Sequence, residues 1–181
     1  MQHAKTLIDT RNPAMQIGLT LAAAALIALG AKVQVPFWPV PMTLQTLAVL
    51  VIAAGLGPRL GLAAMGAYMA AGIAGLPVFA GSPERGLGLA YLAGPTTGFL
   101  IGMALAMVVT GAMARGRGLG MQALALIAGT IAIYVPGLIW LSGFVPSDRL
   151  LAVGVAPFIL GDMVKIVLGT MVLQAGLRLR G

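Results

Sequence analysis

Two oppositely charged side chains, Asp162 and Lys165, stand three residues apart in the apolar stretch 157–174. In a helix, that spacing places both side chains on one face. An ionisable group at the centre of a bilayer costs about 2.5 to 3.5 kcal/mol on insertion scales, so each needs a partner or a polar cavity. One interpretation is a structural ion pair between helices, or a lysine whose long stem lets its ammonium reach the headgroups. The other interpretation is a binding site, because ionisable residues inside a membrane usually mark functional sites.

Such a pair has the chemistry to bind a neutral ligand with two parallel N–H donors and one acceptor. The carboxylate of Asp162 would accept from the donors, and the ammonium of Lys165 would donate to the acceptor. Both buried charges would then be satisfied together. Without the ligand, the two groups would neutralise each other.

Several enzyme classes are excluded by missing residues. Asp162 is the only acidic residue in an apolar run, whereas an intramembrane aspartyl protease needs two, and the only histidine, His3, lies in the polar N-terminal stretch. The chain has no His-Glu-x-x-His motif, which excludes a zinc protease of that class. It also has no Gly-x-x-x-x-Gly-Lys-Ser/Thr phosphate loop, so it cannot hydrolyse ATP unaided. With no cysteine, it has neither disulfides nor thiolate chemistry. We expect no catalytic residues, no metal and no cofactor.

The composition predicts an all-α integral membrane protein. Of 181 residues, 60% are hydrophobic and 8% are charged, and the mean hydropathy is +1.02. One crossing takes about 20 residues, which leaves room for about six transmembrane helices in a single compact domain. The net charge of +7 comes from basic residues scattered at the ends of the apolar runs, which favours lipid headgroups over nucleic acid as the partner.

The apolar runs predict six spans behind a cytoplasmic tail of residues 1–12. The spans cover about residues 14–31, 43–56, 60–76, 96–114, 121–141 and 153–177. The second run has about 14 residues, which is short for a full crossing, so it could be re-entrant or tilted. Pro136 is expected to kink the fifth span.

The distribution of basic residues predicts the orientation of these spans. Seven lysines and arginines fall on one side of the six spans and three on the other, which places both termini in the cytoplasm. The long non-helical segment 77–95, both tryptophans and the start of the sixth span then lie outside. Connections of this length are usually lids or binding loops. The predicted site therefore opens outward.

Five motifs, in order along the chain, resemble the BioY family, the biotin-specific substrate-binding (S) components of energy-coupling factor (ECF) vitamin transporters. The motifs are residues 40–47 (VPMTLQTL), 55–61 (GLGPRLG), 75–81 (GLPVFAG), 94–98 (GPTTG) and 158–165 (FILGDMVK). The resemblance covers about residues 14–175. It implies six helices in a bacterial cell membrane, an outward-open biotin site, and assembly with one transmembrane coupling protein (the T component) and two ATPase subunits.

The resemblance also implies roles for individual residues. Asp162 would accept from the ureido N–H groups of biotin and Lys165 would support the other polar end of that ring. The pocket would be completed by Tyr91, Gln45 and Thr43. The candidates for binding the biotin carboxylate are Arg85 and the backbone of Gly81 and Gly88. A small-residue face of the first span would dock on the coupling protein, and it consists of Thr20, Ala24 and Ala28.

Structural alternatives remain for two of these residues, and one position departs from the family. Tyr91 could equally be an anchor at the membrane interface, and Gln45 could make a hydrogen bond between packed helices. The family more often has Gly and Tyr where this chain has Thr97 and Phe99, so any ligand contact of that tyrosine is lost here.

Two other functions compete with that of a transporter subunit. A stand-alone carrier could use Asp162 as a proton-binding site, and an enzyme of lipid or vitamin chemistry is the third option. The missing phosphate loop favours the transporter subunit, because a chain that cannot hydrolyse ATP would rely on ATPase partners for transport against a gradient.

Vesicles that contain only this chain separate the subunit from the carrier. We expect an imposed pH gradient to cause no accumulation of biotin, because the subunit depends on its ATPases for energy. The measurement is uptake of radiolabelled biotin against time. Accumulation driven by pH alone would support the carrier.

Overall fold

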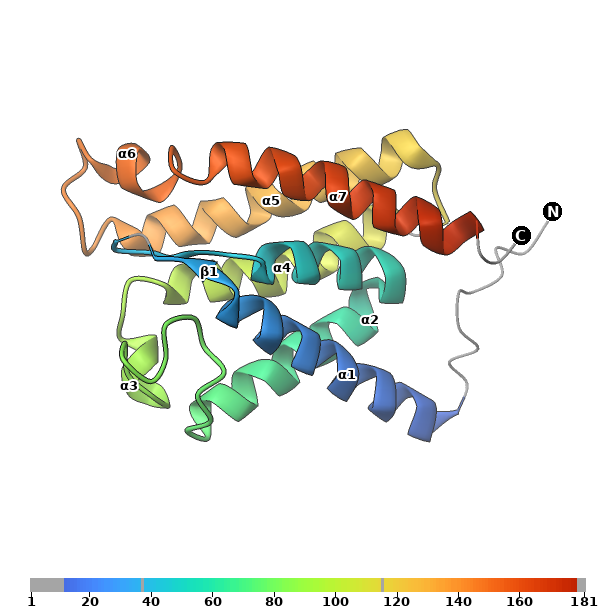
Figure 1. The fold of residues 1–181 in the computed structure, drawn as a ribbon, viewed down its shortest axis with the longest axis horizontal. Coiled ribbons are helices and arrows are strands. Elements are labelled where there is room, and N and C mark those ends of the chain that lie inside the picture. The colour runs from blue at the N-terminus through green and yellow to red at the C-terminus, as the bar shows by residue number, and fades with distance from the viewer. Residues whose placement is uncertain (1–11, 37, 115, 179–181) are drawn as a thin grey trace.

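The computed structural model describes residues 12–36, 38–114 and 116–178, and it is built almost entirely of helices (Figure 1). Residues 1–11, most of the predicted tail, lie outside the described part. The elements in chain order are α1 (Pro13–Lys32), β1 (Gln34–Val35), β2 (Met42–Thr43), α2 (Gln45–Ile73), α3 (Leu89–Leu92), α4 (Thr97–Ala114), α5 (Leu119–Leu141), α6 (Leu150–Gly154) and α7 (Ile159–Arg178). The two strands pair antiparallel in the connection between α1 and α2.

Helix α1 begins where the sequence indicates. The side chain of Asn12 accepts a hydrogen bond from the backbone N–H of Ala14, and Pro13 occupies the first turn, where its missing N–H has no cost. Helices α4 and α5 likewise match the predicted fourth and fifth spans to within two residues at each end.

The predicted second and third spans are the two arms of one element, α2, which breaks at Gly57. That residue has φ 79° and ψ 176°, a conformation that residues with a side chain rarely adopt, and Pro58 follows it. Figure 1 shows the chain reversing its direction there. Gly111 of α4 packs against the break: a Cβ on that residue would lie 2.6 Å from the Pro58 nitrogen. With α2 taken as one helix, the described residues contain five helices that are long and apolar enough to cross a membrane.

The predicted sixth span, about residues 153–177, overlaps a candidate membrane span at Leu150–Gly176 whose helix is interrupted near its start. Helix α6 ends at Gly154, and α7 begins at Ile159 after a turn. Pro157 explains the interruption, because a proline disfavours helical geometry in the residue before it and lacks a donor of its own. As a result, Phe158 is buried and Asp162 lies in the first turn of α7, where a negative charge complements the helix dipole.

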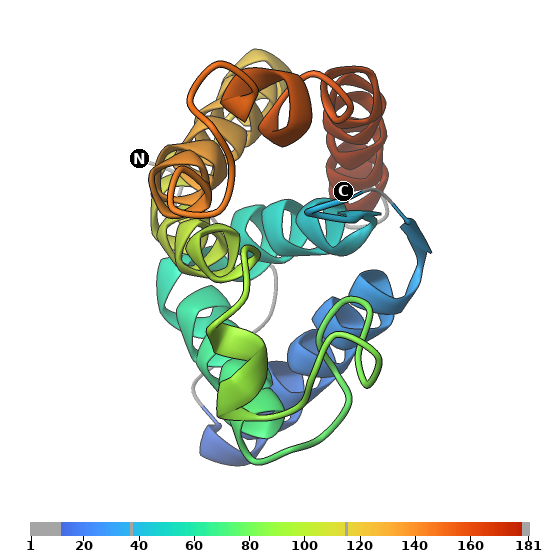
Figure 2. The same ribbon diagram turned by 90° about the vertical axis from the view of Figure 1, so that its left-hand side faces the viewer.

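Close packing of α4 against α5 forms the centre of the molecule. Gly98 and Gly102, one turn apart on α4, lie directly against the backbone of α5 at Pro136 and Ile133. Small residues at this spacing let transmembrane helices approach closely. Seen from the end that carries α3 and α6, the first arm of α2 lies between the α5–α7 side and α1 (Figure 2).

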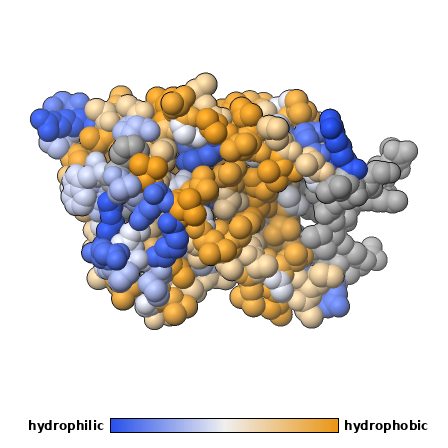
Figure 3. All heavy atoms as spheres, viewed as in Figure 1, coloured by the Kyte–Doolittle hydropathy of each residue, from blue (hydrophilic) through white to orange (hydrophobic). Residues whose placement is uncertain are grey.

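Helix α1 and the span Leu150–Gly176, which comprises α6 and most of α7, are the least buried of the five candidate spans. Figure 3 shows a broad apolar band across the middle of the molecule, with most hydrophilic residues toward its two ends. This distribution is expected for a multi-pass membrane protein, because lipid tails cover the band and water or headgroups cover the ends.

Candidate functional site

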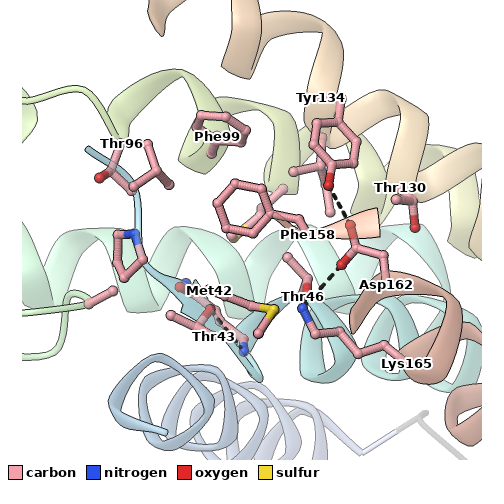
Figure 4. A pocket seen from close by; sticks show the side chains of 16 residues that line it. Met42, Thr43, Thr46, Thr96, Phe99, Thr130, Tyr134, Phe158, Asp162 and Lys165 are labelled. Atoms are coloured by element: carbon pink, nitrogen blue, oxygen red, sulfur yellow. Dashed lines mark hydrogen bonds and ion pairs between the residues drawn. The ribbon is translucent and has the colours of Figure 1, made fainter. Parts of the chain in front are cut away.

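Asp162 and Lys165 form an ion pair inside the helix bundle. Lys165 Nζ lies 3.1 Å from Asp162 Oδ1, and the two side chains are 7% and 14% exposed. The lysine also donates to Thr46 Oγ1 of α2 at 3.0 Å, and Asp162 Oδ2 accepts from the Tyr134 hydroxyl of α5 at 2.5 Å. Figure 4 shows this chain of polar groups, which joins three helices. Each charge therefore has two hydrogen-bonding partners, as burial in a low dielectric requires.

The pair lines a narrow pocket with a cavity volume of about 50 Å³. Ligand pockets usually fall between about 300 and 1,000 Å³, so a bound molecule of that size would need the surrounding side chains to move apart. Apolar side chains form most of the wall, among them Phe99, Met103, Ile133 and Phe158. A largely apolar pocket with a few converging polar groups is the usual form of a small-molecule site.

Thr43 and Gln45, two of the predicted binding residues, also line this pocket. Both side chains are buried, and Thr43 Oγ1 accepts from the backbone N–H of Gln45 at 3.3 Å. The side-chain nitrogen of Gln45 is buried with no hydrogen-bond partner among the described residues. An unmet buried donor costs about 1–3 kcal/mol, so a ligand acceptor within its reach would be favoured.

Tyr91 does not line the pocket but supports its wall. Its hydroxyl donates to the carbonyl of Ala80 at 2.9 Å, and Ala80 is a lining residue. The Tyr91 ring stacks on Phe79 with the centroids 4.6 Å apart. Burial raises the pKa of Tyr91, so the hydroxyl stays protonated and keeps donating. The interpretation of Tyr91 as a direct ligand contact stays a prediction.

The structure also places the three predicted carboxylate-binding residues outside the pocket lining. Arg85 Nη1 donates to the Pro39 carbonyl at 2.8 Å, and its guanidinium lies 5.6 Å from the centre of the Trp38 ring. Gly81 lies against the Arg85 side chain, and Gly88 faces the carbonyl of Ile73. Their role as a carboxylate site stays a prediction.

Lys32 and Arg85 together tie two connections over the pocket. Lys32 Nζ donates to the carbonyls of Phe79 and Ser82 at 3.0 and 2.8 Å, which fixes the segment after α2 to the end of α1. Arg85 fixes the same segment to the residues before β2. Both segments contribute to the lining, through Ala80 and Val40.

The predicted docking residues Thr20, Ala24 and Ala28 are half-buried in α1. Ala24 and Ala28 pack against the buried core, whereas Gly18, Ala25 and other residues of α1 are exposed. The row formed by Thr20, Ala24 and Ala28 therefore lies at the edge of the face of α1 that packs against the neighbouring helices. Its docking role stays a prediction.

Tyr134 and Phe158 line the pocket without having been predicted to do so, although two signals in the sequence point to them. A tyrosine inside an apolar run needs a partner for its hydroxyl. The carboxylate of Asp162, the only acidic side chain in an apolar run, is a suitable acceptor. Pro157 signalled a helix break, but no pattern showed that the break would turn Phe158 inward. Phe99, at the position that departs from the family, also lines the pocket, with its ring 6.3 Å from that of Tyr134.

Comparison with known sequences gives a family match and similar relatives. The sequence profile of the BioY family matches residues 2–181. A "Probable biotin transporter BioY" of Pyrococcus horikoshii is 36% identical over 152 residues, which cover 84% of this chain and 90% of that protein. The "Biotin transporter BioY" of Thermotoga maritima is 37% identical over 150 residues, which cover 82% of this chain and 87% of that protein.

A solved structure shares the fold. It is the crystal structure of an S component for biotin from an ECF-type ABC transporter, with a TM-score of 0.78, 24% identity, and 96% of each chain covered.

Separate and combined substitutions test whether the two charges depend on each other. Asp162→Asn and Lys165→Met should each lower the free energy of unfolding by about 3 kcal/mol or more, because each leaves a buried charge without its partner. The double variant should be much less destabilised than the sum, since no unpaired charge remains. Thermal unfolding of the ligand-free protein in detergent measures this. Strict additivity would show that the two charges do not interact.

Proposed function

This chain belongs to the BioY family, and we propose that it captures biotin from outside the cell as the substrate-binding subunit of an ATP-driven ECF transporter. The observation that carries the proposal is the buried Asp162–Lys165 pair in the wall of an apolar pocket. The family consists of transporters, so the pair serves in binding and not in catalysis.

The hydrogen-bonding capacity of the pair matches the ureido ring of biotin. Lys165 has three N–H donors, of which Thr46 and Asp162 take two, so one is left for the ureido carbonyl. The Asp162 oxygens have about four lone-pair sites, of which Tyr134 and Lys165 use two, so two are left for the ureido N–H groups. Gln45 Nε2 offers a further donor within the same pocket.

The rest of the ligand would fit the apolar wall and the mouth. We assign the fused ring system of biotin to the side chains around Phe99, Met103 and Phe158. Its carboxylate would lie toward the loops, where Arg85 and the backbone of Gly81 and Gly88 remain the candidates. Arg85 would reach it by exchanging the Pro39 carbonyl for a charged acceptor, which makes a stronger hydrogen bond.

The proposal extends to the membrane arrangement and to the partners. We count the two arms of α2 separately, which gives six crossing segments with both termini in the cytoplasm of a bacterium. The chain has no phosphate loop of its own, which supports assembly with a T component and two ATPase subunits. The row of Thr20, Ala24 and Ala28 remains our candidate for the contact with the T component.

Substitution of Asp162 tests the binding model directly. Asp162→Asn should weaken equilibrium binding of labelled biotin about ten- to hundredfold, because hydrogen bonds to a charged group contribute about 1.5–3 kcal/mol. The matched control is Asp148→Asn, the same change at an exposed residue before α6, and it should bind as the wild type does. Thermal unfolding of both variants monitors folding. Unchanged affinity in folded Asp162→Asn would remove the site assignment.

Two tyrosine substitutions separate support of the charge pair from support of the wall. Tyr134→Phe removes the hydroxyl that orients Asp162, and we expect biotin affinity to fall about fivefold, the equivalent of about 1 kcal/mol, because the carboxylate stays in place but loses one bond that orients it. Tyr91→Phe removes the bond to Ala80 and should lower the Tm with a smaller effect on affinity. A larger loss of affinity in Tyr91→Phe than in Tyr134→Phe would favour Tyr91 as the ligand contact.

A further inference from the structure

A second cavity lies between the start of α5 and the second half of α7. It is an open groove with a volume of about 580 Å³. Its wall includes Leu119 and Ala123 of α5, and Ile166, Met171, Gln174 and Arg178 of α7. The groove shares no lining residue with the pocket around Asp162 and Lys165, so it is a separate feature.

The length of the groove matches one leaflet of a bilayer. From Ile166 to Arg178 the helix advances twelve residues, or about 18 Å at 1.5 Å per residue. Half of the hydrocarbon core is about 15 Å. With Arg178 at the level of the headgroups, the apolar wall therefore reaches about to the middle of the bilayer, which is the depth that one acyl chain spans.

The end of the groove is basic. Arg178 is exposed in the last turn of α7, and the exposed Arg117 precedes Leu119 by two residues. Figure 1 shows the start of α5 and the end of α7 at the same end of the molecule. The acidic residues of the described part, Glu84, Asp148 and Asp162, are absent from the groove wall. This charge favours an anionic occupant over a neutral one.

Polar groups lie one turn below the basic end. Gln174 precedes Arg178 by four residues, about 6 Å along the helix, and its Nε2 donates to Gln122 Oε1 of α5 at 2.8 Å. An amide nitrogen has two N–H groups, so this bond uses one and leaves the other for an acceptor. The ester carbonyls of a phospholipid lie below its phosphate in the same order.

We propose that this groove binds one acyl chain of an anionic phospholipid, with its phosphate at Arg178 and Arg117 and its ester carbonyl at Gln174. Basic pockets between transmembrane helices are known to hold such headgroups. The lipid joins α5 to α7, the two helices that supply Tyr134 and Asp162 to the other site. The inference does not depend on which ligand that other site takes.

The test compares phosphatidylglycerol with phosphatidylcholine carrying the same acyl chains. The purified full chain in nonionic detergent is titrated with each lipid, and bound lipid is counted by native mass spectrometry. We expect phosphatidylglycerol to bind about fivefold more tightly or better, which is what one basic residue near an anionic lipid supplies. Arg178→Gln should lower the preference about fivefold, and the double variant with Arg117→Gln should abolish it. Glycerol 3-phosphate should not compete, because it lacks the acyl chain.

Matched variants separate the groove from general charge and bulk. Arg59→Gln removes an exposed arginine beside the break in α2 and should keep the preference. Ala123→Phe fills the groove and should reduce binding of both lipids, whereas Ala22→Phe on the exposed side of α1 should not. The proposal is overturned if the two lipids bind equally to the wild type, or if Arg59→Gln lowers the preference as Arg178→Gln does. Competition by glycerol 3-phosphate would equally overturn it.

Discussion

The cost of placing charge in hydrocarbon is the constraint on which this structure depends. Asp162 and Lys165 would each be expensive alone in a lipid-covered helix, and even as a pair they keep unused bonding capacity. In the fold, Thr46 of α2 accepts a hydrogen bond from Lys165, and Tyr134 of α5 donates one to Asp162. A buried polar network of this kind stabilises only when its members are satisfied together, so the three helices are fixed relative to one another by chemistry as well as by packing.

The packing around the pair is what keeps the pocket from collapsing. Helix α4 lies against α5 through glycines, which holds Phe99 and Met103 on one side of the space. Helix α7 contributes Asp162 and Lys165 from its first two turns, and Phe158 enters from the turn just before it. The loops that cover the other side are held by Lys32, Arg85 and Tyr91, each donating to a backbone carbonyl. No single element forms the site.

The sequence predicts the parts of this arrangement that follow from local pattern. The spacing of Asp162 and Lys165 on one helix face gave the pair, and apolar runs gave most helix boundaries. Burial of Thr43 and Gln45 followed from polar groups at the start of a lipid-embedded helix. What local pattern does not determine is how a loop folds back. The bonds that Tyr91 and Arg85 make to the carbonyls of Ala80 and Pro39 could not be read from the sequence, and their contact with a ligand stays a prediction. Tyr134 was missed because its partner is 28 residues away, and one sequence alone shows no such pairing.

The break at Gly57 determines how deep in the membrane the guest molecule is held. The first arm of α2 has twelve residues before the break, about 18 Å of helix, against a hydrocarbon thickness of about 30 Å. In the proposed orientation, with the exposed Arg59 among the cytoplasmic headgroups, Gln45 and Thr46 at the other end of the arm would lie about 12 Å beneath the outer surface of the hydrocarbon. A molecule resting on them would have most of the bilayer still to cross on its way to the cytoplasm.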